Sequence, residues 1–356
     1  MDGMTHRIAA GWAAAYGLLA LGWTITGRGF PFGTGDSRNA DSVLRALDPA
    51  VGAPVFAVVL LAAAAVLFAA GSGVPARPAL VGYLFLVAFA LLALVADVRL
   101  LTLAGYLPIL VIGFPFGWPP VDYGTIFTWA LANQVCAVAG GLLIARAAIR
   151  WRRRTTGACE ACGRSAATAG WATPEGAARW GRAVTWIAAI IPALYAATRV
   201  AWLAGIPLGI TEEFLAEMRR TGMVWAGAGL GSFALVGTIL TLGLIQRWGE
   251  RFPRWIPFAR GRRVPIRLAT IPASIVAVFV WSASISLFTG EGAGALYDGS
   301  GLASRIPMML WPVWSITLGL AAYAYHLRRR PACGTCHRPE NQPLPGLVTG
   351  AGPGAY

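Results

Sequence analysis

The chain has 356 residues, of which 57% are hydrophobic and only 12% are charged, and its mean hydropathy is +0.62. Soluble domains carry about a quarter charged residues, so this composition excludes a soluble globular protein and indicates an integral membrane protein. The net charge of +14 would suit nucleic-acid binding, but the arginines stand at the ends of apolar stretches, with no polar domain to carry a binding groove. We therefore expect the lipid bilayer, and no nucleic acid, as a partner.

The predicted fold class is an all-α, polytopic helix bundle. A helix needs roughly 20 residues to cross about 30 Å of hydrocarbon. Eight stretches satisfy this in chain order: 8–27, 53–71, 80–101, 125–147, 183–205, 223–246, 266–288 and 307–327. A ninth apolar run, 100–113, continues the third span and contains Pro108, so we expect a break at that proline and an interfacial or re-entrant segment. The first span is too long for a signal-peptide core and lacks an Ala-x-Ala cleavage site, so we expect it to be retained.

The arginines predict the orientation of the spans. The sequence contains no lysine, and its 29 basic residues are all arginine. They gather at alternate ends of the spans, chiefly at Arg7, Arg77, 146–182, 247–267 and Arg328 to Arg330. Positive charge collects on the cytoplasmic side of a membrane. We therefore predict a multi-pass protein of the bacterial plasma membrane with both termini in the cytoplasm.

A short motif predicts an internal repeat. "GFPFG" at 29–33 returns as "GIPLG" at 205–209, and the arginines at 152–154 return at 328–330, each 176 positions later. These matches indicate two parallel four-helix repeats, because a unit with an even number of spans keeps its orientation when it is copied. The predicted division is a first repeat at 1–150, an Arg-rich cytoplasmic loop at 151–182, a second repeat at 183–330 and a cytoplasmic tail at 331–356.

The Gly-Φ-Pro-Φ-Gly motif itself, also present at 113–117, is interpreted as a helix-end device rather than a binding loop. Proline has no N–H and disfavours a helical conformation in the residue before it, whereas glycine permits the turn that follows a helix. The segments after the first copy and its echo, 41–47 and 211–220, are predicted to form short polar helices. In the second of these, Thr211 is the expected N-cap.

Four cysteines form two Cys-x-x-Cys pairs, Cys159 with Cys162 and Cys333 with Cys336, each after the arginine cluster of its repeat. Two such pairs supply the tetrahedral Cys₄ set of structural zinc, and a reducing cytosol disfavours disulfides between them. We predict one zinc ion shared by the four thiolates. The site requires that the two repeats bring their inner ends together.

Two other readings of the cysteines remain open. "CGTCH" at 333–337 is the spelling of a c-type haem attachment motif, although that attachment takes place on the outer face and the predicted topology puts this segment inside. A single Cys-x-x-Cys can also serve as a thiol–disulfide redox pair. Within the fourth span, Cys136 is interpreted as a small buried hydrophobe.

Polar residues inside the spans are candidate functional residues. Asp97, Asn133, Gln134 and Arg199 all lie in the outer half of the predicted membrane region. Asp97 and Arg99 stand two positions apart and would not face each other on a helix, so Arg199 is a candidate partner for Asp97 across the repeats. These residues suit an outward-facing pocket for a small anionic or zwitterionic ligand. The alternative is a structural ion pair with Arg199 reaching towards the interface.

The "GFPFG" turn, the segment "LWPVWSITLGLAAYAYHLRRR" and the following "CGTC" resemble a group of uncharacterised multi-pass membrane proteins of actinobacteria. That resemblance implies a plasma-membrane location and assigns no catalytic residue. The leading functional hypothesis is transport or sensing of a small polar ligand, without a catalytic role. The alternatives are a membrane scaffold that binds another membrane protein or a second copy of itself, and a membrane redox enzyme.

Overall fold

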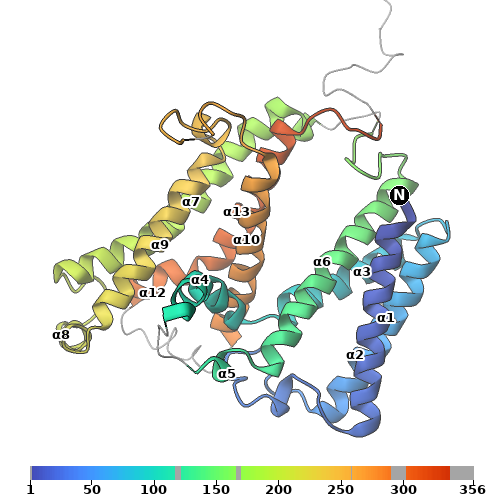
Figure 1. The fold of residues 1–356 in the computed structure, drawn as a ribbon, viewed down its shortest axis with the longest axis horizontal. Helices are drawn as coiled ribbons and strands as arrows, with labels where there is room; N and C mark the ends of the chain where they lie inside the picture. Colours follow the sequence, from blue (N-terminus) through green and yellow to red (C-terminus); the bar gives the residue numbers. More distant parts are fainter. Residues whose placement is uncertain (1, 117–121, 166–169, 258, 290–301, 337–356) are drawn as a thin grey trace, which may run out of the picture.

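The computed structural model describes the chain except for residues 1, 117–121, 166–169, 258, 290–301 and 337–356 (Figure 1). The described part is helical and contains no β-strand. Within these described residues, seven helices are long and apolar enough to cross a membrane: Met4–Thr26, Pro49–Gly71, Pro78–Val95, Trp129–Thr155, Pro174–Ala204, Met223–Gly243 and Ile266–Phe288. The predicted polytopic helix bundle is therefore confirmed. The eighth expected span falls on α12 (Leu302–Met309) and α13 (Trp311–Arg329), which are not among these seven.

Four helices form the first half of the molecule. They are α1 (Asp2–Thr26), α2 (Pro49–Gly71), α3 (Pro78–Phe89) and α6 (Trp129–Thr155). Helix α1 packs along α2 and α6, and α3 packs on α6. The local sequence determines where two of these helices begin. The side chain of Asp48 caps α2 by accepting a hydrogen bond from the N–H of Ala50, and the side chain of Thr128 caps α6 by accepting one from the N–H of Leu131. The short helix α5 (Tyr123–Ile126) precedes α6.

The second half repeats this pattern of packing. Helix α7 (Pro174–Ala204) packs along α9 (Met223–Gly243) and α13, and α10 (Ile266–Thr289) packs on α13. Between α7 and α9 lies α8 (Glu212–Arg220), which Thr211 caps by accepting from the N–H of Phe214, as expected. The prediction of a matching helix at 41–47 is wrong, because this segment forms turns. There Asn39 donates to the carbonyls of Gly33 and Arg45, which holds the loop folded on itself.

The third predicted span is interrupted where no proline stands. Helix α3 passes into the π-helical segment η2 (Ala90–Val95), the backbone becomes extended at Ala96 and Asp97, and α4 (Val98–Gly113) begins. The break expected at position 108 is therefore wrong, because α4 continues through it. Asp97 is the N-cap of α4 and accepts a hydrogen bond from the N–H of Arg99, which gives a new helix a favourable start at this point.

The two halves form two limbs that meet in two places (Figure 1). At one end, residues 156–165 after α6 lie against residues 330–336 after α13. At the other, η2 and α4 of the first half pack on α10 of the second. A π-helical turn releases carbonyl groups from the regular helical ladder, and the Oγ of Ser282 on α10 donates to the carbonyl of Leu92 in η2 at 2.8 Å. The halves are thus tied together by hydrogen bonds as well as by apolar packing.

Candidate metal centre and polar site

The first cysteine pair lies on a tight loop that the backbone closes. After α6 ends, the N–H of Gly163 donates to the carbonyl of Cys159 at 2.7 Å, and the N–H of Cys159 donates to the carbonyl of Arg164 at 2.9 Å. Gly163 adopts a φ of +74°, a left-handed conformation that glycine tolerates without steric cost. The N–H of Arg164 then points at the Sγ of Cys162, 3.5 Å away. This loop turns both thiols towards one point.

The second pair is carried by the chain that leaves α13. The N–H of Thr335 donates to the Sγ of Cys333 at 3.4 Å. Sγ of Cys333 lies 3.9 Å from Sγ of Cys159, and Sγ of Cys336 lies 3.7 Å from Sγ of Cys162. All four sulfur atoms lie within 4.8 Å of one another. Residues 174 positions apart in the chain are therefore gathered into one cluster.

These separations fit one tetrahedral ion. Zinc binds a thiolate at about 2.3 Å, so two corners of a ZnS₄ tetrahedron lie roughly 3.8 Å apart. The two distances measured across the halves, 3.9 and 3.7 Å, bracket this value. The prediction that the four cysteines form one group able to hold a metal ion is confirmed.

The ionisation of the thiols also favours a cation. The backbone N–H groups of Cys336 and Thr335 lower the pKa of Cys333 to about 6, so this thiol is a ready ligand near neutral pH. Burial, together with the three neighbouring thiols, raises the pKa of Cys162 to about 12. Four thiolates cannot gather here without a positive charge between them, and a divalent ion supplies that charge.

Arginine side chains connect the two halves around this cluster. Arg164 is 5% exposed, and its Nη2 donates to the carbonyls of Pro331 at 3.0 Å and Arg330 at 3.4 Å. On the first loop, Arg154 pairs with Glu160 at 2.6 Å. The bonds of Arg164 hold the chain after α13 against the first cysteine loop, and the Arg154–Glu160 pair braces that loop.

The five cysteines are all free thiols. Each close contact across the cluster joins a cysteine of one motif to a cysteine of the other. A redox pair or a haem attachment motif needs one Cys-x-x-Cys alone, so this joint arrangement is better suited to ion binding.

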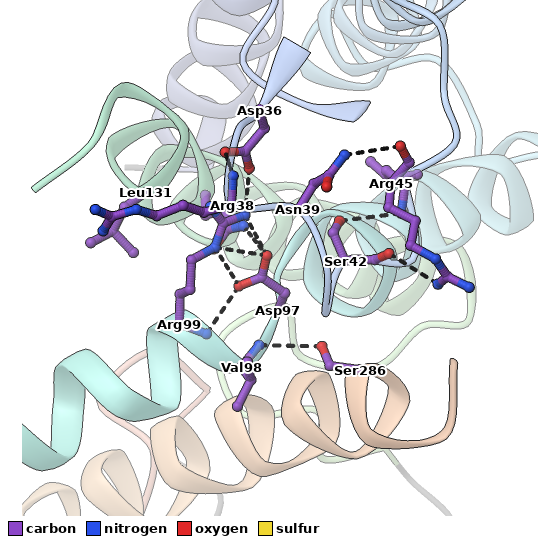
Figure 2. Close-up of polar contacts among 12 residues, drawn as sticks. Asp36, Arg38, Asn39, Ser42, Arg45, Asp97, Val98, Arg99, Leu131 and Ser286 are labelled. Atoms are coloured by element: carbon purple, nitrogen blue, oxygen red, sulfur yellow. Dashed lines mark hydrogen bonds and ion pairs between the residues drawn. The ribbon is translucent and has the colours of Figure 1, made fainter. Parts of the chain in front are cut away.

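A second polar cluster lies at the opposite end of the helices (Figure 2). From Pro78 to Val95 the chain rises roughly 25 Å away from the cysteine end. There Asp97, 2% exposed, accepts from Nε and Nη2 of Arg99 at distances of 2.6 to 3.0 Å. Nη2 of Arg99 also lies 2.8 Å from the carboxylate of Asp36. The expectation that Asp97 and Arg99 would not meet is wrong, because the backbone at Asp97 is extended and lets the Arg99 side chain fold back.

Two further predicted residues lie in the same region. Nε2 of Gln134, which is fully buried, donates to Asp97 at 2.6 Å. Asn133 accepts from the hydroxyl of Tyr16 at 2.8 Å and donates to the carbonyl of Trp129. Among the described residues, Oε1 of Gln134 and Nη1 of Arg99 are buried and have no hydrogen-bond partner.

Arg199 lies elsewhere. Its guanidinium stacks on the rings of Tyr195 and Trp202, with centroid distances of 4.4 and 4.0 Å, on the side of α7 that faces Gly231 of α9. The structure therefore joins Asp97 to Arg99 and Asp36, and it does not bring Arg199 into this cluster. Arg199 belongs to a helix of the second half, whereas the partners of Asp97 come from the first.

Sequence reasoning missed several members of the polar cluster. Asp36 lies in a loop, where nothing in the pattern distinguishes it from other acidic residues. The Oγ of Ser286 on α10 accepts a hydrogen bond from the N–H of Val98 at 3.2 Å (Figure 2). Ser282 and Ser286 stand four positions apart in an apolar span, and this spacing on one helix face is a signal that could have been used.

The resulting picture is a helical membrane bundle with a four-cysteine cluster at one end and a buried Asp–Arg–Gln cluster at the other. Both clusters draw on residues far apart in the chain. Comparison of the chain with family models, with characterised proteins and with solved structures found no match.

Proposed function

We propose that the chain is a bacterial plasma-membrane protein of two parallel four-helix repeats, clamped at their cytoplasmic ends by one structural zinc ion. The observation that carries this proposal is the gathering of four Sγ atoms from two separate Cys-x-x-Cys motifs within 4.8 Å. Zinc is the favoured metal because it prefers a closed tetrahedral set of thiolates in structural sites. The role is structural, since all four positions around the ion are filled by protein.

The backbone angles of the glycines in the Gly-Φ-Pro-Φ-Gly motif support the repeat. Gly29 and Gly205, 176 positions apart, have φ angles of 89° and 91°, and Gly33 and Gly209 have φ angles of 72° and 73°. The packing of α1 with α2 and α6 is matched by that of α7 with α9 and α13. In this proposal α13 is the eighth span, and residues 151–182 and 331–356 are the cytoplasmic segments that carry the metal ligands.

Metal analysis tests the clamp. We expect one equivalent of zinc per purified chain, and a large loss of zinc in each of the four single Cys→Ser variants, because each removes one corner of the same tetrahedron. Cys136→Ser is the matched control: this cysteine lies in α6, outside the cluster, and its loss leaves the zinc content unchanged. Two equivalents of metal, or full occupancy after removal of any corner, would contradict a shared ion.

A second candidate function is transport or sensing of a small polar ligand at the buried cluster of Asp97, Asn133 and Gln134. A specific observation favours it: the unpartnered Oε1 of Gln134 is an acceptor and the unpartnered Nη1 of Arg99 is a donor, both buried beside Asp97. Buried polar atoms without partners are costly, and a zwitterion such as an amino acid supplies both complementary groups.

Thermal unfolding of the purified chain in the presence of free amino acids tests this second function. A ligand of the site raises the melting temperature of the wild type and fails to do so for Gln134→Leu. Gln246→Leu, the same chemical change at an exposed position at the cysteine end, serves as control. The absence of stabilisation by every amino acid would argue for a purely structural cluster.

A further inference from the structure

A cavity of about 400 Å³ lies beside the cysteine cluster, between the two halves. Phe85 of α3 and Ile149 of α6 contribute from the first half, and Tyr323 and Leu327 of α13 contribute from the second. Its size is within the range of roughly 300–1,000 Å³ found for ligand sites. Because residues of both halves line it, the cavity depends on the same closure that assembles the cysteine cluster.

The charge of the cavity wall has one sign. Four arginines line it, Arg152, Arg153, Arg164 and Arg330, and no aspartate or glutamate is among the lining residues. Arg164 is 5% exposed, so its charge is held in an environment that water reaches poorly. A phosphate group is a partner that arginine binds especially well, because the planar guanidinium donates paired hydrogen bonds to its oxygens.

The cavity is separate from the centre of the cysteine cluster, because among the cysteines only Cys162 lines it.

Apolar side chains of the helices also line the cavity. Phe85 stands seven positions after the start of α3 at Pro78, roughly 10 Å along the helix. The arginines stand at the ends of the spans, and the apolar side chains lie further along the helices. This arrangement suits an amphiphile whose anionic headgroup lies at the loop and whose chains lie against the helices. A soluble phosphate would make no use of this apolar wall.

We propose that this cavity binds the headgroup of an anionic phospholipid. The phosphate is held by the arginines from the first loop and from the end of α13, and the acyl chains lie along α3, α6 and α13. Since the headgroup contacts both halves, the lipid adds a second bridge between them beside the metal ion. This inference goes beyond the zinc clamp and beyond the polar ligand site.

The test uses the purified, full-length chain in detergent micelles and measures its binding of phosphatidylcholine and of phosphatidylglycerol added to the micelles. We expect tighter binding and a higher melting temperature with phosphatidylglycerol. Replacement of one headgroup arginine lowers the affinity for phosphatidylglycerol roughly fivefold. Arg164→Gln tests the buried contact, and Arg152→Gln tests an exposed one whose loss leaves the packing intact.

Arg254→Gln is the matched control, because it removes one exposed arginine from the loop between α9 and α10, outside the cavity. Equal binding of both lipids, or wild-type affinity for phosphatidylglycerol in Arg152→Gln, would overturn the proposal. Equal stabilisation by inorganic phosphate alone would overturn the assignment to a lipid. Zinc content is measured in the same samples: loss of the lipid preference with zinc retained rejects only the lipid site, and a lipid preference without zinc rejects only the clamp.

Discussion

The turn that follows α1 and the turn that follows α7 have matching glycine angles and different surroundings. In "GFPFG" the glycines Gly29 and Gly33 have φ angles of 89° and 72°, and in "GIPLG" Gly205 and Gly209 have 91° and 73°. The glycine angles match, but the helices end at different points. Helix α7 ends directly at Gly205, as a helix-end device requires, whereas α1 ends at Thr26 and Gly27, before the first glycine of its motif.

The side chains between the glycines differ sharply in exposure. Phe30 and Phe32 are 7% and 2% exposed, whereas Ile206 and Leu208 are 57% and 47% exposed. The two phenylalanine rings contact each other and the ring of Phe56 on α2 at centroid distances of 5.5 to 5.6 Å. The local sequence thus sets the backbone, and the neighbouring elements decide whether the turn becomes part of a core.

The same contrast extends through the two halves. The largest core cluster lies wholly between Ala9 and Trp151, while the second half contains smaller separate clusters. Between α9 and α10 a cavity of about 880 Å³ is lined mainly by apolar side chains, whereas in the first half Tyr83 of α3 donates to the carbonyl of Val59 on α2. The first half is therefore closely packed, whereas the second half has the same arrangement of helices around an apolar cavity.

The largest expected effect comes from truncating one apolar side chain in each turn. Phe32→Ala should lower the free energy of unfolding by about 3–5 kcal/mol, because it leaves a cavity among buried rings. Leu208→Ala should change it by less than about 0.5 kcal/mol, because the side chain is half exposed. Thermal or denaturant unfolding in detergent measures both values. Equal losses at the two positions would show that the second turn is also buried, for instance by a partner.

A second test adds one methyl group to each turn. An alanine at either glycine pays roughly 1–2 kcal/mol for a left-handed conformation. At Gly33 the added Cβ would also lie 1.9 Å from the carbonyl oxygen of Leu47, so Gly33→Ala should cost about 1–3 kcal/mol more than Gly209→Ala. The difference in unfolding free energy between the two variants is the measurement. A smaller loss at Gly33 would mean that the loop at Leu47 moves away without cost.

The smallest effect concerns the acidic residue that follows each turn. Asp36 and Glu212 are 176 positions apart, but Asp36 pairs with Arg99 and its side chain is 7% exposed, whereas Glu212 stands exposed in the first turn of α8. Asp36→Asn should destabilise by about 1–3 kcal/mol, and Glu212→Gln by about 0.3–1 kcal/mol through the helix dipole. High salt should abolish only the second effect, because exposed charges are screened. An equally salt-sensitive loss at Asp36 would place that pair at the surface.

Composition and span length were sufficient to predict the helical membrane bundle, because a bilayer accepts only segments whose backbone bonds are satisfied internally. The grouping of the cysteines also followed from the sequence, since two Cys-x-x-Cys pairs at matched positions imply a shared ion. The break in the third span did not follow. The apolar run continues through Ala90 to Val95, and the π-helical turn there accepts a hydrogen bond from Ser282 of α10, which lies 190 positions away in the chain.

The ion-pair partner of Asp97 is a second feature that the sequence alone did not predict. The helical spacing rule excluded Arg99 correctly for a continuous helix, and it failed because the helix is not continuous at that point. What the sequence determined by itself was local: the spans, the left-handed glycine turns and the types of ligand available for a metal. Which side chains became buried, and which charges met, was decided by the packing of helices from both halves, because burial and Coulomb energy depend on neighbours in space rather than on neighbours along the chain.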